Sequence, residues 1–164
     1  AWKESRVMLA DVSEDALDLA RMNASRLGLH AVQLVRSDLF EKITGRFDLV
    51  TANLPYIPSG EIAGLSREVR KDPVLALDGG ADGLDIIRRF LIDVRPFLAA
   101  DAFIALEVGH DQGAPVAVLA EAQGFQQVRL MADLAGIERF VLGVYPASAV
   151  TSSEESAAPE LAPL

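Results

Sequence analysis

The sequence contains no cysteine, and this absence excludes several classes of protein at once. Disulfide scaffolds, thiolate metal sites and cysteine nucleophiles all require a residue that the chain does not have. Histidine is scarce too, with two residues, and no spacing of histidine and carboxylate residues indicates a metal site. We therefore expect no metal centre.

Long apolar runs and an excess of positive charge are also absent. No run is long enough to span a membrane, and residues 1–11 lack the layout of a signal peptide, so we expect a cytoplasmic protein. The formal net charge is −9, whereas tight non-specific binding to nucleic acid needs basic residues that neutralise phosphates. Arg67, Arg70 and Lys71 lie close together in sequence, and we interpret them as a solvated helix face. No strong binding to nucleic acid is expected.

What the sequence does contain is an alternation of strand and helix patterns in a chain of 164 residues. The pattern predicts a mainly parallel sheet with helices on both faces. The last two strands are separated by a short connection, which predicts that they pair antiparallel. Residues 147–164 are rich in Ala, Ser, Glu and Pro, and their composition predicts a disordered tail. The expected strands are residues 6–10, 31–35, 47–52, 102–108, 125–131 and 139–144, and the expected helices are 13–27, 84–98 and 115–123.

The first helix has clear start and stop signals. Ser13 is a suitable N-cap and Gly28 a suitable terminator. Its expected apolar face consists of Leu17, Ala20, Ala24 and Leu27.

Polar residues lie at the carboxyl ends of four of the expected strands, namely Asp11, Asp38, Asn53 and Glu107. Ligands of open parallel sheets bind beyond the carboxyl ends of the strands. Because Ser13 is available as the helix cap, Asp11 is free to accept hydrogen bonds from both hydroxyls of a ribose. Asp38 fits a site for an adenine amino group, with Leu39 and Phe40 covering the ring. The alternatives are a helix cap for the acidic residues and ordinary core packing for Leu39 and Phe40.

The most specific motif is Asn53-Leu54-Pro55-Tyr56, directly after an expected strand. An amide or exocyclic amino nitrogen is a poor nucleophile because its lone pair is delocalised. The Asn53 side-chain oxygen and the Leu54 carbonyl oxygen are two acceptors that can hold both of its hydrogens. Pro55 stiffens the turn, and Tyr56 offers a face for stacking. Such a site works mainly by positioning and charge stabilisation. The alternative is an Asn-x-Pro turn with a buried tyrosine.

Residues 47–58 resemble the (N/D)PPY motif of amino-group methyltransferases. More closely, they resemble the HemK/PrmC family of protein-(glutamine-N5) methyltransferases. Four further stretches match that family: residues 68–70 (EVR), 76–84 (ALDGGADGL), 106–113 (LEVGHDQG) and 133–136 (DLAG). The resemblance extends from about residue 6 to 145.

The resemblance implies a class I, Rossmann-like methyltransferase fold, with residues 1–146 as the catalytic domain and S-adenosylmethionine as the methyl donor. The implied substrate is the glutamine amide in the Gly-Gly-Gln loop of a peptide chain release factor. The implied cofactor-binding residues are Asp11, Val12, Asp38, Leu39 and Asn53. Asn53, Leu54, Pro55 and Tyr56 form the implied catalytic motif, in which Asn53, Leu54 and Tyr56 bind the substrate amide.

The chain departs from the family in two places. Leu54 replaces the usual proline, which keeps the backbone carbonyl but makes the turn less rigid. The family's first strand, its glycine-rich loop D-x-G-x-G-x-G and its helical N-terminal domain have no counterpart here. That strand lies between the family's second and fourth strands, so we expect either a fragment with two unpaired inner edges or a sheet that has closed up. Gly79, Gly80 and Gly83 do not replace the loop, and we interpret them as a turn.

Two other functions remain open from the sequence. One is a nucleic-acid adenine-N6 or guanine-N2 methyltransferase, which uses the same Asn-x-Pro-Tyr chemistry. The acidic composition of this chain and the four family stretches count against a nucleic-acid methyltransferase. The other is a non-catalytic binding module, which the missing glycine-rich loop supports. For the same reason we expect the chain as given to bind S-adenosylmethionine poorly.

Overall fold

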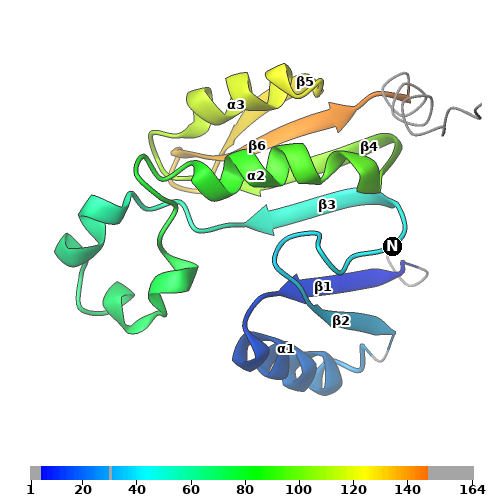
Figure 1. Ribbon diagram of the computed structural model, residues 1–164, viewed down its shortest axis with the longest axis horizontal. Coiled ribbons are helices and arrows are strands. Elements are labelled where there is room, and N and C mark those ends of the chain that lie inside the picture. The colour runs from blue at the N-terminus through cyan, green and yellow to red at the C-terminus, as the bar shows by residue number, and fades with distance from the viewer. Residues whose placement is uncertain (1–4, 30, 148–164) are drawn as a thin grey trace, which may run out of the picture. The chain divides into compact units, whose positions relative to one another are not determined.

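The computed structural model describes residues 5–29 and 31–147, in two compact units, Ala1–Gly45 and Arg46–Leu164 (Figure 1). Each unit has its own sheet and is described separately. Apart from Ala147, the predicted tail lies outside the described residues. Within the described ranges, no helix has both the length and the apolar character needed to span a membrane.

The first unit is a strand–helix–strand motif. It contains β1 (Val7–Asp11), α1 (Glu14–Arg26) and β2 (Val32–Arg36). The two strands are parallel, with Val7 beside Val32 and Asp11 beside Arg36. Both strands agree with the sequence prediction to within one residue at each end.

Helix α1 begins and ends where the sequence predicts. The Ser13 hydroxyl accepts a hydrogen bond from the Ala16 N–H at 3.3 Å, and Gly28 has a φ of +68°, the left-handed conformation that ends helices. Leu17 is buried, with 4% of its surface exposed. Leu27, however, is 73% exposed, so its assignment to the apolar face is wrong. It is the C-cap residue, where the chain leaves the helix.

The second unit contains a four-stranded mixed sheet in the order β3-β4-β6-β5. Its strands are β3 (Phe47–Asn53), β4 (Leu98–Glu107), β5 (Gln126–Ala132) and β6 (Glu138–Tyr145). The β3–β4 pair is parallel, whereas β6 is antiparallel to both β4 and β5. The predicted antiparallel final pair is confirmed. β1 and β3 each have a hydrogen-bonded neighbour on one side, β2 and β4 respectively, which leaves one edge of each strand without a partner in the described chain.

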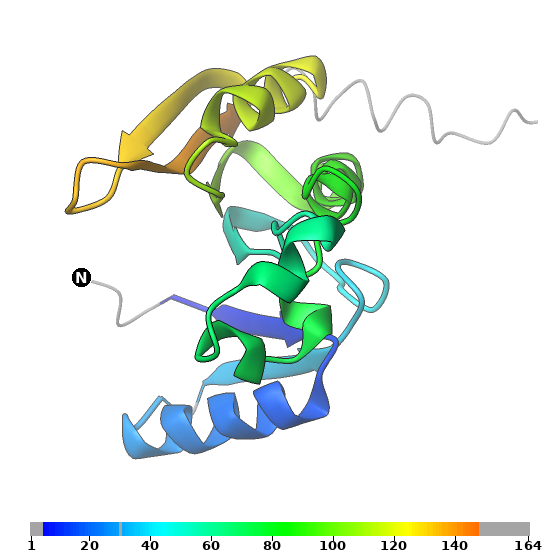
Figure 2. The same ribbon diagram turned by 90° about the vertical axis from the view of Figure 1, so that its left-hand side faces the viewer.

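Helices α2 (Asp85–Asp93) and α3 (Gly113–Ala122) cover the same face of this sheet (Figure 2). The core between them and the sheet contains residues with little or no exposed surface: Ile87, Phe90, Leu91, Val116, Ala120, Ala102, Ile104, Leu106 and Val141. On the opposite face, the register partners Leu49 and Phe103 are 46% and 52% exposed. Within this unit the prediction of helices on both faces is therefore not met.

Helix α2 is shorter than predicted because of Pro96. The helix ends at Asp93, and a 3-10 turn, η4 (Arg95–Phe97), leads into β4 at Leu98 rather than at residue 102. Proline has no N–H to donate, and its ring clashes with the preceding helical turn. The predicted helix 84–98 thus becomes a helix, a turn and the first residue of a strand.

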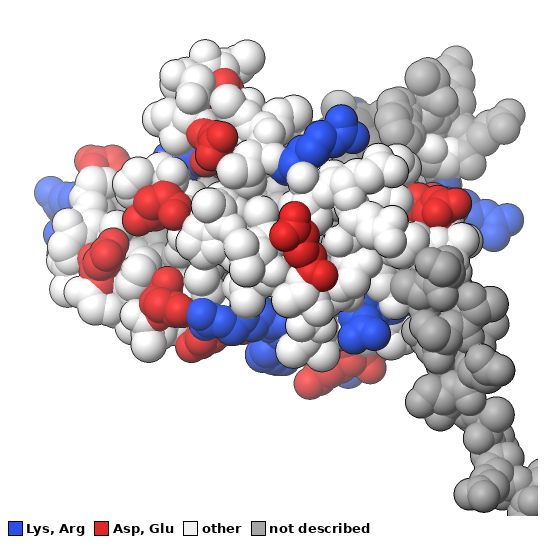
Figure 3. All heavy atoms as spheres, turned by 90° about the horizontal axis from the view of Figure 1, so that it is seen from above, with Lys and Arg blue, Asp and Glu red and all other residues white. Residues whose placement is uncertain are grey.

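Three short 3-10 helices interrupt the long loop between β3 and α2. They are η1 (Ser59–Gly64), η2 (Val69–Lys71) and η3 (Val74–Ala76). Arg67, Arg70 and Lys71 are exposed around η2, as expected of solvated residues. The face drawn in Figure 3 shows acidic and basic side chains interspersed.

Candidate active site

Asn53 and Glu107 are the last residues of two adjacent parallel strands, β3 and β4, and are partners in their register. The Asn-Leu-Pro-Tyr segment therefore starts at the carboxyl edge of the sheet, where open sheets bind ligands. Asn53 is exposed, and the three residues after it are half-buried. This is the position predicted from the sequence.

The two acceptors predicted in this segment are unoccupied by the protein itself. In the part of the chain that the structure describes, neither the Asn53 side chain nor the Leu54 carbonyl oxygen has a hydrogen-bond partner. A buried or half-buried carbonyl normally finds one. Both oxygens are therefore available to N–H groups from outside the chain.

The backbone after Tyr56 is fixed by residues 77–80. The Ile57 N–H donates to the Leu77 carbonyl at 3.0 Å, and the Ile57 carbonyl accepts from the Gly79 N–H at 2.9 Å. These bonds form a short parallel bridge between Ile57 and Asp78. The Ser59 N–H adds a third bond, to the Gly80 carbonyl at 2.9 Å. The turn is thus attached to the segment that leads into α2.

Two glycines allow this segment to approach the turn closely. A Cβ atom on Gly79 would lie 2.8 Å from the Pro55 carbonyl oxygen and 2.6 Å from that of Gly83. A Cβ on Gly83 would lie 2.3 Å from the Tyr56 carbonyl oxygen, and Gly83 also has a φ of +76°. The prediction that these glycines form a turn into the helix is confirmed. The structure adds that they pack against the backbone of the Asn-Leu-Pro-Tyr segment.

Gln112 supplies a side-chain contact to the same turn. Its Nε2 donates to the Tyr56 carbonyl at 2.8 Å, and its Oε1 accepts from the Gly109 N–H at 2.9 Å. Gln112 belongs to the family-like stretch 106–113, but the sequence indicates no role for it. No local pattern could have shown the contact, because the two residues are 56 positions apart.

Carboxylates stabilise the start of α2 beside the turn. The Ser59 hydroxyl and the Gly80 N–H both donate to the Asp78 carboxylate, at 2.6 and 2.9 Å, and these bonds lower the pKa of Asp78. Two hydrogen bonds from the Arg88 guanidinium, supported by the Leu84 N–H, lower the pKa of Asp82 to about 2. The same pair raises the pKa of Arg88.

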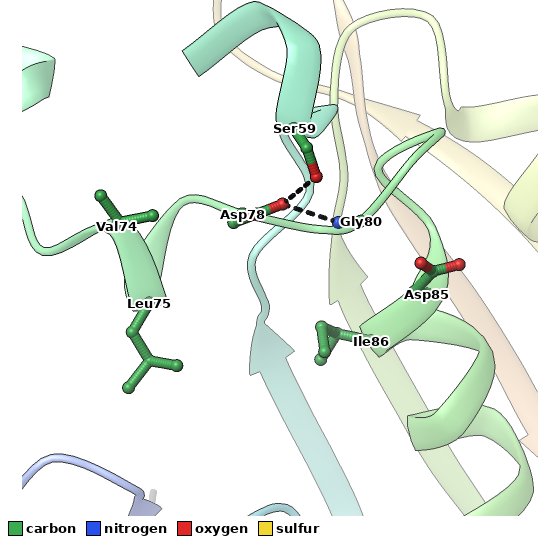
Figure 4. A pocket seen from close by; sticks show the side chains of 7 residues that line it. All are labelled: Ser59, Val74, Leu75, Asp78, Gly80, Asp85 and Ile86. Carbon is green, nitrogen blue, oxygen red and sulfur yellow. Dashed lines mark hydrogen bonds between the residues drawn. The ribbon is translucent and has the colours of Figure 1, made fainter. Parts of the chain in front are cut away.

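A hollow of about 420 Å³ adjoins the turn (Figure 4). Val74 and Leu75 stand on one side, and Ile86 faces them from the start of α2. The hydrogen-bonded pair Ser59 and Asp78 lies between them. The full lining consists of Ser59, Val74, Leu75, Asp78, Gly80, Asp85 and Ile86. It combines apolar walls with carboxylates.

The residues predicted to bind a cofactor nucleoside belong to the other unit. The Asp11 carboxylate is exposed and accepts a hydrogen bond from the Ser13 N–H at 2.8 Å through one oxygen. The carbonyl of the next residue, Val12, accepts from the Arg36 Nε at 3.2 Å. Leu39 has a φ of +44°, a left-handed conformation that is uncommon outside glycine and is often found at functional sites. Asp38 is half-buried beside it. Among the residues that the structure describes, no cluster of potential metal ligands occurs.

Curated proteins similar to this chain are glutamine methyltransferases. The release factor glutamine methyltransferase of Agrobacterium fabrum is 41% identical over 132 residues, which cover 79% of this chain and 46% of that protein. The enzyme of the same name from Moorella thermoacetica is 42% identical, over 84% of this chain and 50% of that protein. The ribosomal protein uL3 glutamine methyltransferase of Neisseria gonorrhoeae is 37% identical, over 68% and 38%. The chain spans about half the length of the curated relatives it matches. No family model matches it.

Methyltransferases are among the solved structures with a similar fold. A methyltransferase from Pyrococcus furiosus aligns with a TM-score of 0.63 at 16% identity, covering 86% of this chain and 63% of that one. A ribosomal protein L11 methylase from Lactobacillus delbrueckii aligns with a TM-score of 0.59, also at 16% identity, covering 85% and 56%. The fold is that of class I methyltransferases, as the sequence predicts.

Proposed function

Because this chain is related to the release factor glutamine methyltransferases, as the resemblance of its motifs predicts, we propose that it is part of an enzyme that methylates the side-chain amide of glutamine. The observation that supports the proposal most directly is the pair of unpartnered acceptors on Asn53 and Leu54. They sit at the carboxyl edge of the sheet, on a turn whose backbone is braced from residues 77–83 and from Gln112.

The two acceptors explain how an unreactive nitrogen is used. Hydrogen bonds from the amide N–H groups to the Asn53 side-chain oxygen and the Leu54 carbonyl oxygen fix the orientation of the nitrogen. The dipoles of both acceptors stabilise the positive charge that develops on it during transfer. With S-adenosylmethionine bound, its sulfonium would supply the methyl group to this nitrogen, and one amide proton would pass to solvent. The half-buried Tyr56 provides a face beside the planar amide.

S-adenosylmethionine supplies the methyl group in this proposal. The residues that would hold its nucleoside are Asp11 and Val12 at the ribose and Asp38 and Leu39 at the adenine. The Asp11 carboxylate fits this role, because it is exposed and one of its oxygens is not engaged by the Ser13 N–H. Leu39 also has a left-handed backbone conformation, which is often found at functional sites.

A protein substrate fits better than nucleic acid. The relatives are named for a release factor and a ribosomal protein, and the release factor enzymes of Agrobacterium fabrum and Moorella thermoacetica match over more of this chain, 79% and 84%, than the uL3 enzyme of Neisseria gonorrhoeae, 68%. We therefore place the substrate glutamine in the Gly-Gly-Gln loop of a release factor. The nucleic-acid methyltransferase and binding-module alternatives gain no support from these relatives over this function.

A transfer assay tests the proposal. A form of the protein extended at its N-terminus to the length of the relatives is incubated with labelled S-adenosylmethionine and, separately, with release factor, uL3, DNA and RNA. Label on one glutamine of the release factor, located by mass spectrometry, is the expected result. Label on uL3 alone would move the substrate to the ribosomal protein, and label on nucleic acid would overturn the proposal.

A further inference from the structure

We propose that Gln112 is a positioning residue for amide transfer, which holds the Asn-Leu-Pro-Tyr turn in its reactive shape. The inference rests on the function proposed above. It assigns a role to a side chain that lies on a different element from the turn and contacts neither of the predicted amide acceptors.

The Gln112 amide bridges two loops through both of its polar atoms. Its Nε2 donates to the Tyr56 carbonyl, and its Oε1 accepts the Gly109 N–H, both at normal hydrogen-bond distances of 2.8 and 2.9 Å. The residue is 8% exposed. A buried amide with donor and acceptor both satisfied has one favoured orientation, so Gln112 fixes the position of the Tyr56 carbonyl relative to the β4–α3 loop.

Gln112 makes this bridge instead of capping its own helix. It occupies the N-cap position of α3, yet its side chain forms no capping hydrogen bond. One of its two hydrogen bonds stays within its own loop, to Gly109, and the other reaches Tyr56, 56 positions away.

Glycines surround the amide and leave room for it. A Cβ on Gly83 would lie 2.6 Å from the Gln112 Nε2, and a Cβ on Gly109 would lie 2.8 Å from its Oε1. A larger residue at either position would displace the amide. The space around Gln112 is therefore shaped for this side chain and its two bonds.

The bridge made by Gln112 matters because the Asn-Leu-Pro-Tyr turn lacks one source of rigidity. Leu54 stands where the family that the motif resembles has proline, so no ring fixes the φ angle at this position. The Tyr56 carbonyl is two residues beyond the Leu54 carbonyl that would accept the substrate amide. Displacing the Tyr56 carbonyl would shift the Leu54 carbonyl relative to the methyl donor. An error of about 1 Å in such a geometry can lower a rate about 100-fold.

Two substitutions separate positioning from stability. In Gln112→Glu the carboxylate still accepts the Gly109 N–H but cannot donate to the Tyr56 carbonyl. Gln112→Met fills the same space without either bond. Gln123→Met is the matched control, because Gln123 is a half-buried glutamine at the other end of α3. All three are made in the N-terminally extended protein and assayed below their melting temperatures, with rates normalised to the fraction that binds S-adenosylmethionine.

For both Gln112 variants we expect kcat to fall about 10- to 100-fold. We also expect the Kd for S-adenosylmethionine and the KM for release factor to stay within about twofold, and Gln123→Met to behave as the parent. Normalised kcat values equal to that of the parent in both Gln112 variants would overturn the inference. So would equal losses in kcat and in cofactor affinity.

A second readout does not depend on activity. Hydrogen exchange of the Ile57 amide, which is bonded to the Leu77 carbonyl, reports on the turn in the chain itself. We expect the Ile57 amide to exchange at least tenfold faster in both Gln112 variants than in the parent. In Gln123→Met its exchange rate should equal that of the parent. If the parent transfers no methyl group, the proposed function fails. Unchanged exchange at Ile57 in the Gln112 variants would contradict the positioning role of Gln112, whether or not the parent is active.

Discussion

Asn53 and Glu107 lie side by side at the carboxyl ends of β3 and β4, paired in a parallel register that continues back to Leu49 and Phe103. The strand pair sets where the turn begins, and Asn53 contributes an acceptor rather than a packing contact, since it is exposed. Replacing its side chain should therefore remove chemistry without removing structure.

We predict that Asn53→Ala in the extended protein nearly abolishes transfer to release factor. Loss of one of two acceptors should cost about 2–4 kcal/mol of transition-state stabilisation, by analogy with oxyanion-hole donors, or roughly a 30- to 900-fold lower kcat. Affinity for S-adenosylmethionine, measured by calorimetry, should stay nearly unchanged. Asp48→Ala, at an exposed position near the start of the same strand, is the control. Activity within a few-fold of the parent would show that Asn53 is structural.

The 164-residue chain alone is expected to bind S-adenosylmethionine weakly or not at all. Asp11, Asp38 and Leu39 can serve the adenosine end, but the sequence has no D-x-G-x-G-x-G loop for the methionine end, where the backbone must approach closely. Calorimetry with S-adenosylmethionine and S-adenosylhomocysteine compares the chain with its extended form. Low-micromolar binding by the chain alone would mean that another segment does the work of that loop.

The ion pair between Asp82 and Arg88 should make stability depend on acid pH. The pKa of Asp82 is about 2 in the folded chain, below its ordinary value of 3.8. Folding therefore favours the ionised carboxylate, and the pair's contribution is present above about pH 4 and lost as the pH falls toward 2. In thermal melts, Asp82→Asn should be less stable than the parent at pH 7, and the difference should shrink toward pH 2. A constant difference across this range would contradict the assignment.

Adding a methyl group at Gly79 should disturb the backbone of the Asn-Leu-Pro-Tyr turn. In Gly79→Ala the new Cβ would lie 2.8 Å from the Pro55 carbonyl oxygen and 2.6 Å from the Gly83 carbonyl oxygen, and backbone must shift to relieve both contacts. We expect a loss of about 1–3 kcal/mol in the free energy of unfolding. Denaturant titration measures it. Gly64→Ala serves as the control, because nothing lies within 4 Å of a Cβ there; equal effects at both sites would argue against close packing at Gly79.

Local signals predict most of the secondary structure. Ser13 and Gly28 set the ends of α1, and the apolar runs locate every strand, because capping and strand patterns depend on neighbouring residues. The failures arise where a single residue overrides a pattern. Pro96 splits the predicted helix 84–98, and Leu27 continues an apolar period beyond the point where the helix has ended.

The site was only partly predictable, for a physical reason. The chemistry proposed for Asn53 and its neighbours follows from their side-chain types and their place after a strand. The residues that hold the turn, Gln112 above all, are brought to it by tertiary packing. A hydrogen bond across 56 positions, and glycines selected by contact with another backbone segment, leave no periodicity in the sequence.

Within the described residues of the second unit, one edge of β3 has no strand partner, and this has a practical consequence for purification. An unpaired strand edge offers N–H and C=O groups to a second molecule, and here the neighbouring face also exposes Leu49 and Phe103. Preparations of the isolated chain should self-associate as they are concentrated. Sedimentation profiles recorded over a dilution series belong before any calorimetric titration, so that weak ligand binding is not mistaken for protein lost to aggregates.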